Sequence, residues 1–273
     1  MQAMCAFGDY LCSIGMRELA PATCPFDPGV APVVLESHLQ QSAHLMLSLK
    51  ISMACWMIAK EPATRSKVAA ARAAGVPTST GGGPYEVAVA QGRLPEYLDL
   101  CADVGFDGIE CGAGFTDPQA SAQAVVGMAA QRGLHVEYEL GKKHCGEFDL
   151  AGLADLLEEG RRWLGAGART LVIEARESAA GIGIFGTGGR LNTELAERIV
   201  TELGLSSVVF EAPSKASQFA LLDHFGPQVQ LANVPLDEVL RVEIYRRGLH
   251  SDAFANPSLR PAAAAASRAA AEA

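Results

Sequence analysis

The sequence predicts an α/β fold in which parallel strands close into a (β/α)8 barrel, also called a TIM barrel. Segments typical of strands and of helices alternate with short connections, which favours parallel strands joined by right-handed crossovers. Successive strand-like runs end in a carboxylate or an amide, as expected where the carboxyl ends of barrel strands form an active site. The length of 273 residues suits one barrel of this type.

Seven strand-like runs can be identified from residue 45 to residue 234, each apolar or β-branched and bounded by turn-forming residues. They are 45–52, 76–80, 106–112, 134–140, 170–175, 206–212 and 229–234. An eighth strand is expected near residues 22–26, where the pattern is weaker. The intervening segments carry apolar residues at helical spacing, at 33–46, 61–75, 94–105, 117–133, 149–167, 192–204, 215–226 and 236–248.

We expect three regions: an extension over residues 1–25, the barrel over 26–255, and a low-complexity, alanine-rich tail over 256–273. The net charge of −9 and the lack of a basic run argue against a nucleic-acid partner. No run of about 18 uncharged apolar residues occurs, so we expect no membrane span. The 7 cysteines form no CxxC motif, and the chain opens with no secretory pattern, which favours free thiols in the cytoplasm.

Four strand-like runs end in glutamate, at Glu110, Glu139, Glu174 and Glu211, and a fifth ends in Asn233. In a barrel these side chains would converge at the C-terminal ends of the strands. Carboxylates that converge repel one another unless a cation lies between them. Mg²⁺ suits two or three carboxylates together with water and substrate oxygens, so we predict a magnesium site there. Salt bridges that close the barrel mouth are the alternative for any single glutamate.

Several cations follow the strand-like runs, namely Lys142, Lys143, Arg176 and Lys215. A lysine beside Mg²⁺ is an arrangement that forms and protonates an enediolate. We also consider Arg246 and Arg247 as anion-binding residues, although they could instead complement a helix dipole. The glycines at 81–83 could bring backbone N–H groups to a phosphate, but a tight turn after the strand is the better explanation of a lone glycine-rich segment.

Long segments of the chain resemble the phosphosulfolactate synthases. The resemblance runs from about Asp27 to Asp252 and is carried by the segments "ELGKK", "VIEARES", "VFEAPSK", "LANV" with "DEVL", and "RRGL". It implies a Mg²⁺-dependent (β/α)8 barrel that adds sulfite to C3 of phosphoenolpyruvate in coenzyme M synthesis. The implied product forms through an enediolate held by Mg²⁺, to which a lysine then delivers a proton at C2.

The resemblance also implies residue roles. Lys143 is the expected general acid, and Glu139 and Lys50 are further catalytic candidates. The family's strand-end carboxylates correspond to Glu86, Glu110, Glu139, Glu174 and Glu211, of which all but Glu86 are our metal candidates. The expected substrate-binding residues are Gly82, Gly83, Arg176, Lys215, Asn233, Arg246 and Arg247. Barrels of this family often associate, so we also expect a homo-oligomer.

The chain departs from the family pattern at several polar positions. Pro28 stands where the family has lysine, "ISMAC" at 51–55 replaces Phe-Gly-Trp-Gly-Thr, and Gly83 replaces threonine. The family's Ser-Asp-Gly becomes Gly-Ala-Gly at 112–114, and its Arg-Gly-Asp-Thr becomes "HSDA" at 250–253. Three interpretations therefore stay open: the family reaction, the same enediolate chemistry on another substrate, or a non-enzymatic, stress-related relative.

Overall fold

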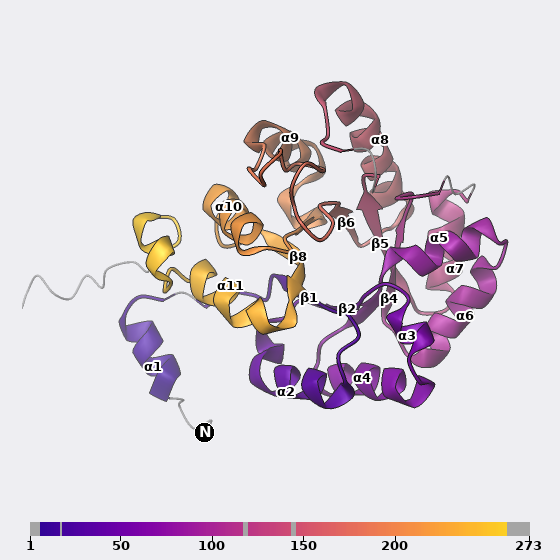
Figure 1. Cartoon of the computed structure of the whole chain (residues 1–273), viewed down its shortest axis with the longest axis horizontal. Coiled ribbons are helices and arrows are strands. Elements are labelled where there is room, and N and C mark those ends of the chain that lie inside the picture. Colours follow the sequence, from indigo (N-terminus) through magenta and orange to yellow (C-terminus); the bar gives the residue numbers. More distant parts are fainter. Residues whose placement is uncertain (1–5, 17, 117–119, 143–145, 261–273) are drawn as a thin grey trace, which may run out of the picture.

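The computed structural model describes residues 6–16, 18–116, 120–142 and 146–260 (Figure 1). Its sheet is a closed barrel in which each strand pairs in parallel with the next one in sequence, and β8 pairs with β1. The predicted fold class is therefore confirmed, including the weak first strand. The strands are β1 (Thr23–Asp27), β2 (Leu49–Ile51), β3 (Thr78–Thr80), β4 (Gly108–Gly112), β5 (His135–Leu140), β6 (Thr170–Ile173), β7 (Val208–Glu211) and β8 (Gln230–Pro235).

Helices surround the barrel, and α1 lies outside this ring (Figure 1). Two short helices were not predicted: α3, and α5, which contains the glycines that were interpreted as a turn. The helices are α1 (Ala6–Ser13), α2 (Pro32–Ser42), α3 (Cys55–Ile58), α4 (Glu61–Ala73), α5 (Gly82–Ala90), α6 (Leu94–Val104), α7 (Ala122–Ala130), α8 (Leu150–Ala166), α9 (Thr193–Leu203), α10 (Lys215–Phe225) and α11 (Val239–Arg246).

Alternation along each strand separates the apolar core from the barrel interior. On β5, Val136, Tyr138 and Leu140 belong to the apolar core cluster, which also contains residues of the surrounding helices, whereas Glu137 and Glu139 occupy the alternate positions. The interior therefore receives the polar residues, and its apolar part is a small cluster of Cys24, Val209 and Ala232. Burial raises the pKa of the Cys24 thiol to about 11, which keeps this thiol neutral.

The five cysteines among the described residues are free thiols, as predicted. Within the described part of the chain, no helix combines the length and apolarity needed to cross a bilayer. The predicted tail lies largely outside the described residues, which end at residue 260. Strand β1 begins at Thr23, shortly before the predicted start of the barrel domain at residue 26.

Candidate active site

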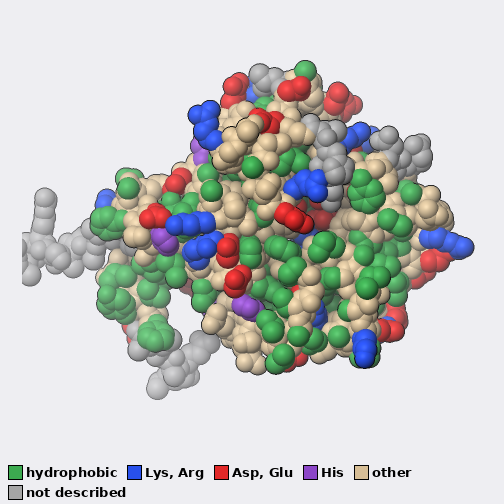
Figure 2. Space-filling model, viewed as in Figure 1, with side chains coloured by type: hydrophobic (Ala, Val, Ile, Leu, Met, Phe, Trp, Pro, Cys, Tyr) green, Lys and Arg blue, Asp and Glu red, His purple; other side chains and the backbone are tan. Residues whose placement is uncertain are grey.

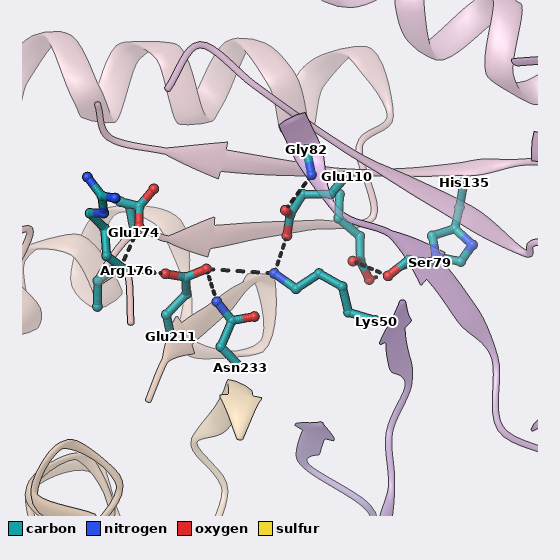
Figure 3. A network of polar contacts seen from close by, with 11 residues as sticks. Lys50, Ser79, Gly82, Glu110, His135, Glu174, Arg176, Glu211 and Asn233 are labelled. Carbon is teal, nitrogen blue, oxygen red and sulfur yellow. Dashed lines mark hydrogen bonds and ion pairs between the residues drawn. The ribbon is translucent and has the colours of Figure 1, made fainter. Parts of the chain in front are cut away.

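Lys50 lies at the centre of a polar network at the C-terminal ends of the strands, which we call the rim. Its Nζ donates to Glu110 Oε2 at 2.7 Å and lies 3.6 Å from Glu211 Oε1 (Figure 3). Burial alone would lower the pKa of Lys50, but the carboxylates of Glu110, Glu211 and Glu139 outweigh burial and raise this pKa. Lys50 is therefore a permanent, buried positive charge among carboxylates.

Glu110 is held by Lys50 and by the first turn of α5. The backbone N–H of Gly82 donates to Glu110 Oε1 at 2.9 Å, so a carboxylate of the protein occupies this helix N-terminus. Gly82 thus orients Glu110, and its role in binding substrate stays a prediction. A Cβ on the neighbouring Gly81 would meet the backbone nitrogen of Met53 at 2.7 Å, which explains why glycine precedes the helix. Gly83 is partly exposed beside Phe115.

Three of the four predicted metal-binding glutamates converge. Each of Glu139, Glu174 and Glu211 offers a carboxylate oxygen, and these atoms all lie within 4.8 Å of one another. All three residues are buried, with at most 3% of their surface exposed. Clustered carboxylate oxygens are the hard donors that Mg²⁺ prefers. Buried carboxylates this close also repel one another strongly, and a bound cation would relieve that repulsion. Glu110 is not part of this group, because it is bound to Lys50 and Gly82.

Backbone and side-chain donors fix the orientation of this group. Glu211 Oε2 accepts from the N–H groups of Ala175 at 2.8 Å and Arg176 at 3.0 Å, and Glu211 Oε1 accepts from Asn233 Nδ2. Glu174 Oε1 accepts from the Arg176 N–H at 2.6 Å (Figure 3). Arg176 and Asn233 both have φ of +54°, a strained conformation that is retained where a functional site requires it. Asn233 thus orients Glu211, and it also lines the rim cavity, so its role in binding substrate stays a prediction.

The remaining predicted cations at the rim are less enclosed. The side chain of Arg176 lies beside Glu174 (Figure 3), and the residue is exposed. Lys215 begins α10 and is half-exposed, and its Nζ lies 3.1 Å from Asp252 Oδ2. Lys142 is exposed and lines a smaller cavity of about 380 Å³ next to Glu139. Lys143 lies outside the described residues, so its predicted role as general acid stays a prediction.

The predicted role of Arg246 and Arg247 in binding substrate is not supported, because both lie at the opposite end of the barrel. Arg246 is buried and donates to the carbonyl of Val229 at 2.7 Å, immediately before β8. It also donates to Thr23 Oγ1 at 3.1 Å, at the start of β1. Both arginines contact Glu243. They therefore close the N-terminal end of the barrel where β1 meets β8, and their role there is to stabilise the fold.

One further group of polar residues was missed from the sequence. Glu137 lies deeper in the barrel than Glu139, where it accepts from Ser79 Oγ at 3.2 Å. Burial alone would raise the pKa of Glu137, but its hydrogen bond with His135 and the charges of His135 and Lys50 lower it. The alternation of His135, Glu137 and Glu139 along β5 was the signal that could have revealed this interior group.

Glu86, which the family resemblance grouped with the strand-end carboxylates, lies on α5 and makes structural contacts. It is buried on α5, and its Oε2 accepts from the backbone N–H groups of Phe115 at 2.9 Å and Thr116 at 2.8 Å. Thr116 Oγ1 also donates to it at 2.9 Å. Glu86 therefore does not face the metal candidates but holds the segment that follows β4 in place.

A cavity of about 900 Å³ opens at the rim and contains Lys50, Glu110, Glu139, Glu211 and Asn233. It extends away from these polar groups between α3 on one side and α5 and α6 on the other. This part of its wall is largely apolar and includes Met53, Met57, Val87, Tyr97, Leu100 and Phe115, and Gln91, Arg93 and Glu96 are its polar members. None of these was predicted as a site residue, although "ISMACWM" immediately after β2 is an unusually apolar sequence for a rim segment.

Comparison with known proteins identifies relatives of a single activity. The family model described as (2R)-phospho-3-sulfolactate synthase (ComA) matches residues 20–252. The phosphosulfolactate synthase of Methanocaldococcus jannaschii is 29% identical over 85% of this chain and 93% of its own length. That of Bacillus subtilis is 30% identical over 64% of this chain and 69% of its own length.

Solved structures resemble the chain in fold alone. The 3-hexulose-6-phosphate synthase of Salmonella typhimurium aligns with a TM-score of 0.56 at 11% identity, over 84% of this chain and 100% of its own. The 3-dehydroquinate dehydratase of Geobacillus kaustophilus aligns with a TM-score of 0.54 at 13% identity, over 83% and 91% of the two chains. At these identities the likeness supports the barrel architecture and says nothing about substrate.

Proposed function

We propose, from the premise that this chain belongs to the (2R)-phospho-3-sulfolactate synthase family, that it is a carbon–sulfur bond-forming enzyme which adds sulfite to C3 of phosphoenolpyruvate. The sulfur lone pair would form the new bond to C3, and the electrons of the C2–C3 double bond would move toward the carboxylate. A proton delivered to C2 would complete the addition, with no oxidant or reductant needed. Such a reaction would open coenzyme M synthesis.

The arrangement of Glu139, Glu174 and Glu211 supports a resident Mg²⁺ in this proposal. These residues would hold the ion, because their oxygens are clustered and buried, and backbone donors orient the carboxylates of Glu174 and Glu211. When bound, the ion would supply a Lewis acid that favours negative charge on the substrate carboxylate. The observation that carries the proposal is the cluster of glutamate carboxylates around Lys50 in a chain that belongs to this family.

The chain's own residues have separable tasks in the proposed reaction. Lys50, whose pKa is raised, would remain protonated and provide a fixed positive charge instead of exchanging protons. A preoriented charge of this kind stabilises developing negative charge without reorganisation. Arg176 and Lys215 extend from the β6 and β7 ends and would attract the anionic groups of the substrates. Lys143 is the proposed proton donor to C2.

Replacing Lys143 with Ala tests the proton-transfer step. Turnover should fall at least 10²-fold, as for loss of a general acid, while phosphoenolpyruvate still binds in calorimetry with Mg²⁺. Lys142→Ala is the matched control on the neighbouring residue and should retain most of the activity. Near-normal turnover by the Lys143→Ala enzyme would remove this residue from the mechanism.

A second candidate function is the same addition chemistry on a larger substrate. The apolar extension of the rim cavity favours it, because two small anions have no use for such a wall. Activity on a larger carboxylate, together with no turnover of phosphoenolpyruvate, would favour this candidate over the first.

A further inference from the structure

We infer that the apolar part of the rim cavity is a binding subsite for the carbon chain of a carboxylate substrate whose head group lies at Glu139, Glu174 and Glu211. This inference rests on the proposed function, because it takes the position of the head group from it. It gives the larger substrate of the second candidate function a chemical class: a 2-oxo or enol-type acid with an apolar chain, which phosphoenolpyruvate lacks. We call this part of the cavity the apolar arm, and define it by Met53, Met57, Val87, Leu100 and Phe115.

The exposure of these side chains is the first support. Met53, Val87 and Phe115 expose 53%, 53% and 49% of their surfaces, and Met57 and Leu100 expose 47% and 40%. Apolar residues exposed singly are unremarkable, but a contiguous group that lines a concavity marks a binding surface. Figure 2 shows hydrophobic side chains gathered over the region of α3, α5 and α6.

Continuity with the polar network is the second support. The same cavity contains Lys50, Glu110 and Glu139 at one end and Leu100 at the other. A ligand held at the carboxylate end would therefore extend into the arm without leaving the cavity. Concave sites with a mostly apolar wall and a few convergent polar groups are typical of small-molecule binding.

The walls of the arm are also held in a defined shape. Phe115 is positioned through its backbone N–H, which donates to the buried carboxylate of Glu86. Burying a carboxylate is costly unless it is hydrogen-bonded, so the bonds that Glu86 accepts hold this segment in a defined position. On the other side, Met53 has φ of +52° and its backbone packs against Gly81, which fixes the segment leading to α3.

Aromatic packing supports α3 from beneath. Trp56, on this helix, packs against Tyr97 with ring centroids 6.3 Å apart and against Phe106 at 5.1 Å. Met57, the next residue, consequently faces the cavity from a supported helix. Both walls of the apolar arm are thus held in place by packing or hydrogen bonds, as a binding surface requires.

The polar and apolar parts of the rim lie over different strands. Arg176 and Lys215 follow β6 and β7, whereas Met53, Gly83 and Phe115 follow β2, β3 and β4. A substrate with a charged end and an apolar end would therefore adopt one orientation across the rim. Its anionic groups would lie toward β6 and β7, and its chain would lie toward α3 and α5.

Calorimetric titration with a homologous series of 2-oxo acids tests the inference. Pyruvate, 2-oxobutanoate, 2-oxohexanoate and 2-oxooctanoate share one head group and differ in chain length, and each is titrated with Mg²⁺ present. Burying a methylene group strengthens binding about fourfold, so affinity should rise by about this factor per carbon until the arm is filled.

Variants localise the effect. Leu100→Gln should remove most of the gain for 2-oxohexanoate and 2-oxooctanoate while leaving the affinity for pyruvate unchanged. Leu240→Gln is the matched control, because Leu240 on α11 is similarly exposed, at 38%, and does not line the cavity. This control should bind the whole series like the unmodified protein.

The outcomes separate failure of the arm from failure of the head-group site. Equal affinity for all four acids would overturn the apolar arm and leave the proposed function intact. No binding of any acid with Mg²⁺ present would overturn the head-group site and the arm together. The four acids could also bind with equal affinity while Leu100→Gln sediments as a smaller assembly than the unmodified protein. That result would show that a second copy of the chain covers this surface, and it would also overturn the inference.

Discussion

Both ends of the barrel bury charged side chains, but they balance the charge differently. At the N-terminal end, Glu243 accepts from Thr23 Oγ1 at 2.5 Å and Arg246 Nε at 2.9 Å, and Arg247 adds a second cation. The remaining donors of Arg246 are directed at backbone carbonyls and at Thr23 Oγ1. At the C-terminal rim, four buried glutamates surround Lys50, and two of them lie within 4 Å of its Nζ.

This difference separates structural charge from functional charge. A buried network in which every carboxylate is paired with a cation and donors reach acceptors stabilises one arrangement of the chain. A buried network with excess negative charge destabilises the folded state until a cation or a substrate group joins it. Burial alone does not distinguish the two ends, whereas local charge balance does.

Lys50→Met should have the largest effect, because it removes the positive charge around which the rim is built. We expect kcat/KM to fall on the order of 10³-fold, equivalent to about 4 kcal/mol of transition-state stabilisation. Steady-state kinetics with Mg²⁺ and both substrates measure the loss. Circular dichroism confirms that the variant is folded. Activity within threefold of the unmodified enzyme would show that Lys50 is only a structural counterion.

Arg246→Met should act on stability and leave catalysis intact. Removing one partner of a buried ion pair costs about 3 kcal/mol, at the lower end of the usual range because Arg247 still contacts Glu243. Urea denaturation measures this loss. Assays well below the unfolding transition should give an unchanged kcat, and a fall in kcat without a loss of stability would contradict the assignment of this end to structure.

Mg²⁺ should stabilise the protein through the rim carboxylates. An ion at 100 times its Kd adds about 2.7 kcal/mol, which for a chain of this size raises Tm by roughly 5–10 °C. Differential scanning fluorimetry with and without a chelator measures the shift. Glu174→Gln should remove most of it, whereas Glu243→Gln at the other end should lower Tm but preserve the response to Mg²⁺.

Lys215→Ala should have the smallest effect. Lys215 and Asp252 form an exposed ion pair at the rim, and such pairs contribute little to stability. We expect an unchanged urea midpoint and a modest increase in the KM for phosphoenolpyruvate, with kcat preserved. An unchanged KM as well would exclude Lys215 from substrate binding.

The part of the rim formed by residues at the ends of the strands was predictable from the sequence. Glu139, Glu174 and Glu211 each follow an apolar run, and the parallel topology brings them together. The position of Arg246 was not predictable, because it depends on how the last helix crosses the seam between β8 and β1. The helix formed by residues 82–90 was missed because its glycines resemble a turn, although "YEVAVA" follows them.

The apolar arm was beyond sequence analysis for a different reason. Met53, Val87 and Leu100 come from three separate elements, and each alone has the pattern of an ordinary surface or core residue. Only the packing of α3 against α6 and the anchoring of Phe115 by Glu86 bring them around one cavity. Tertiary contacts of this kind leave no periodic signal in the chain.

The most direct test of the account is a product assay with phosphoenolpyruvate, sulfite and Mg²⁺, read by mass spectrometry and phosphorus NMR. We expect a phosphosulfolactate signal that disappears with a chelator and is nearly lost in Lys50→Met. Unchanged phosphoenolpyruvate after incubation with folded, Mg²⁺-loaded protein would contradict carbon–sulfur bond formation from these substrates at the rim.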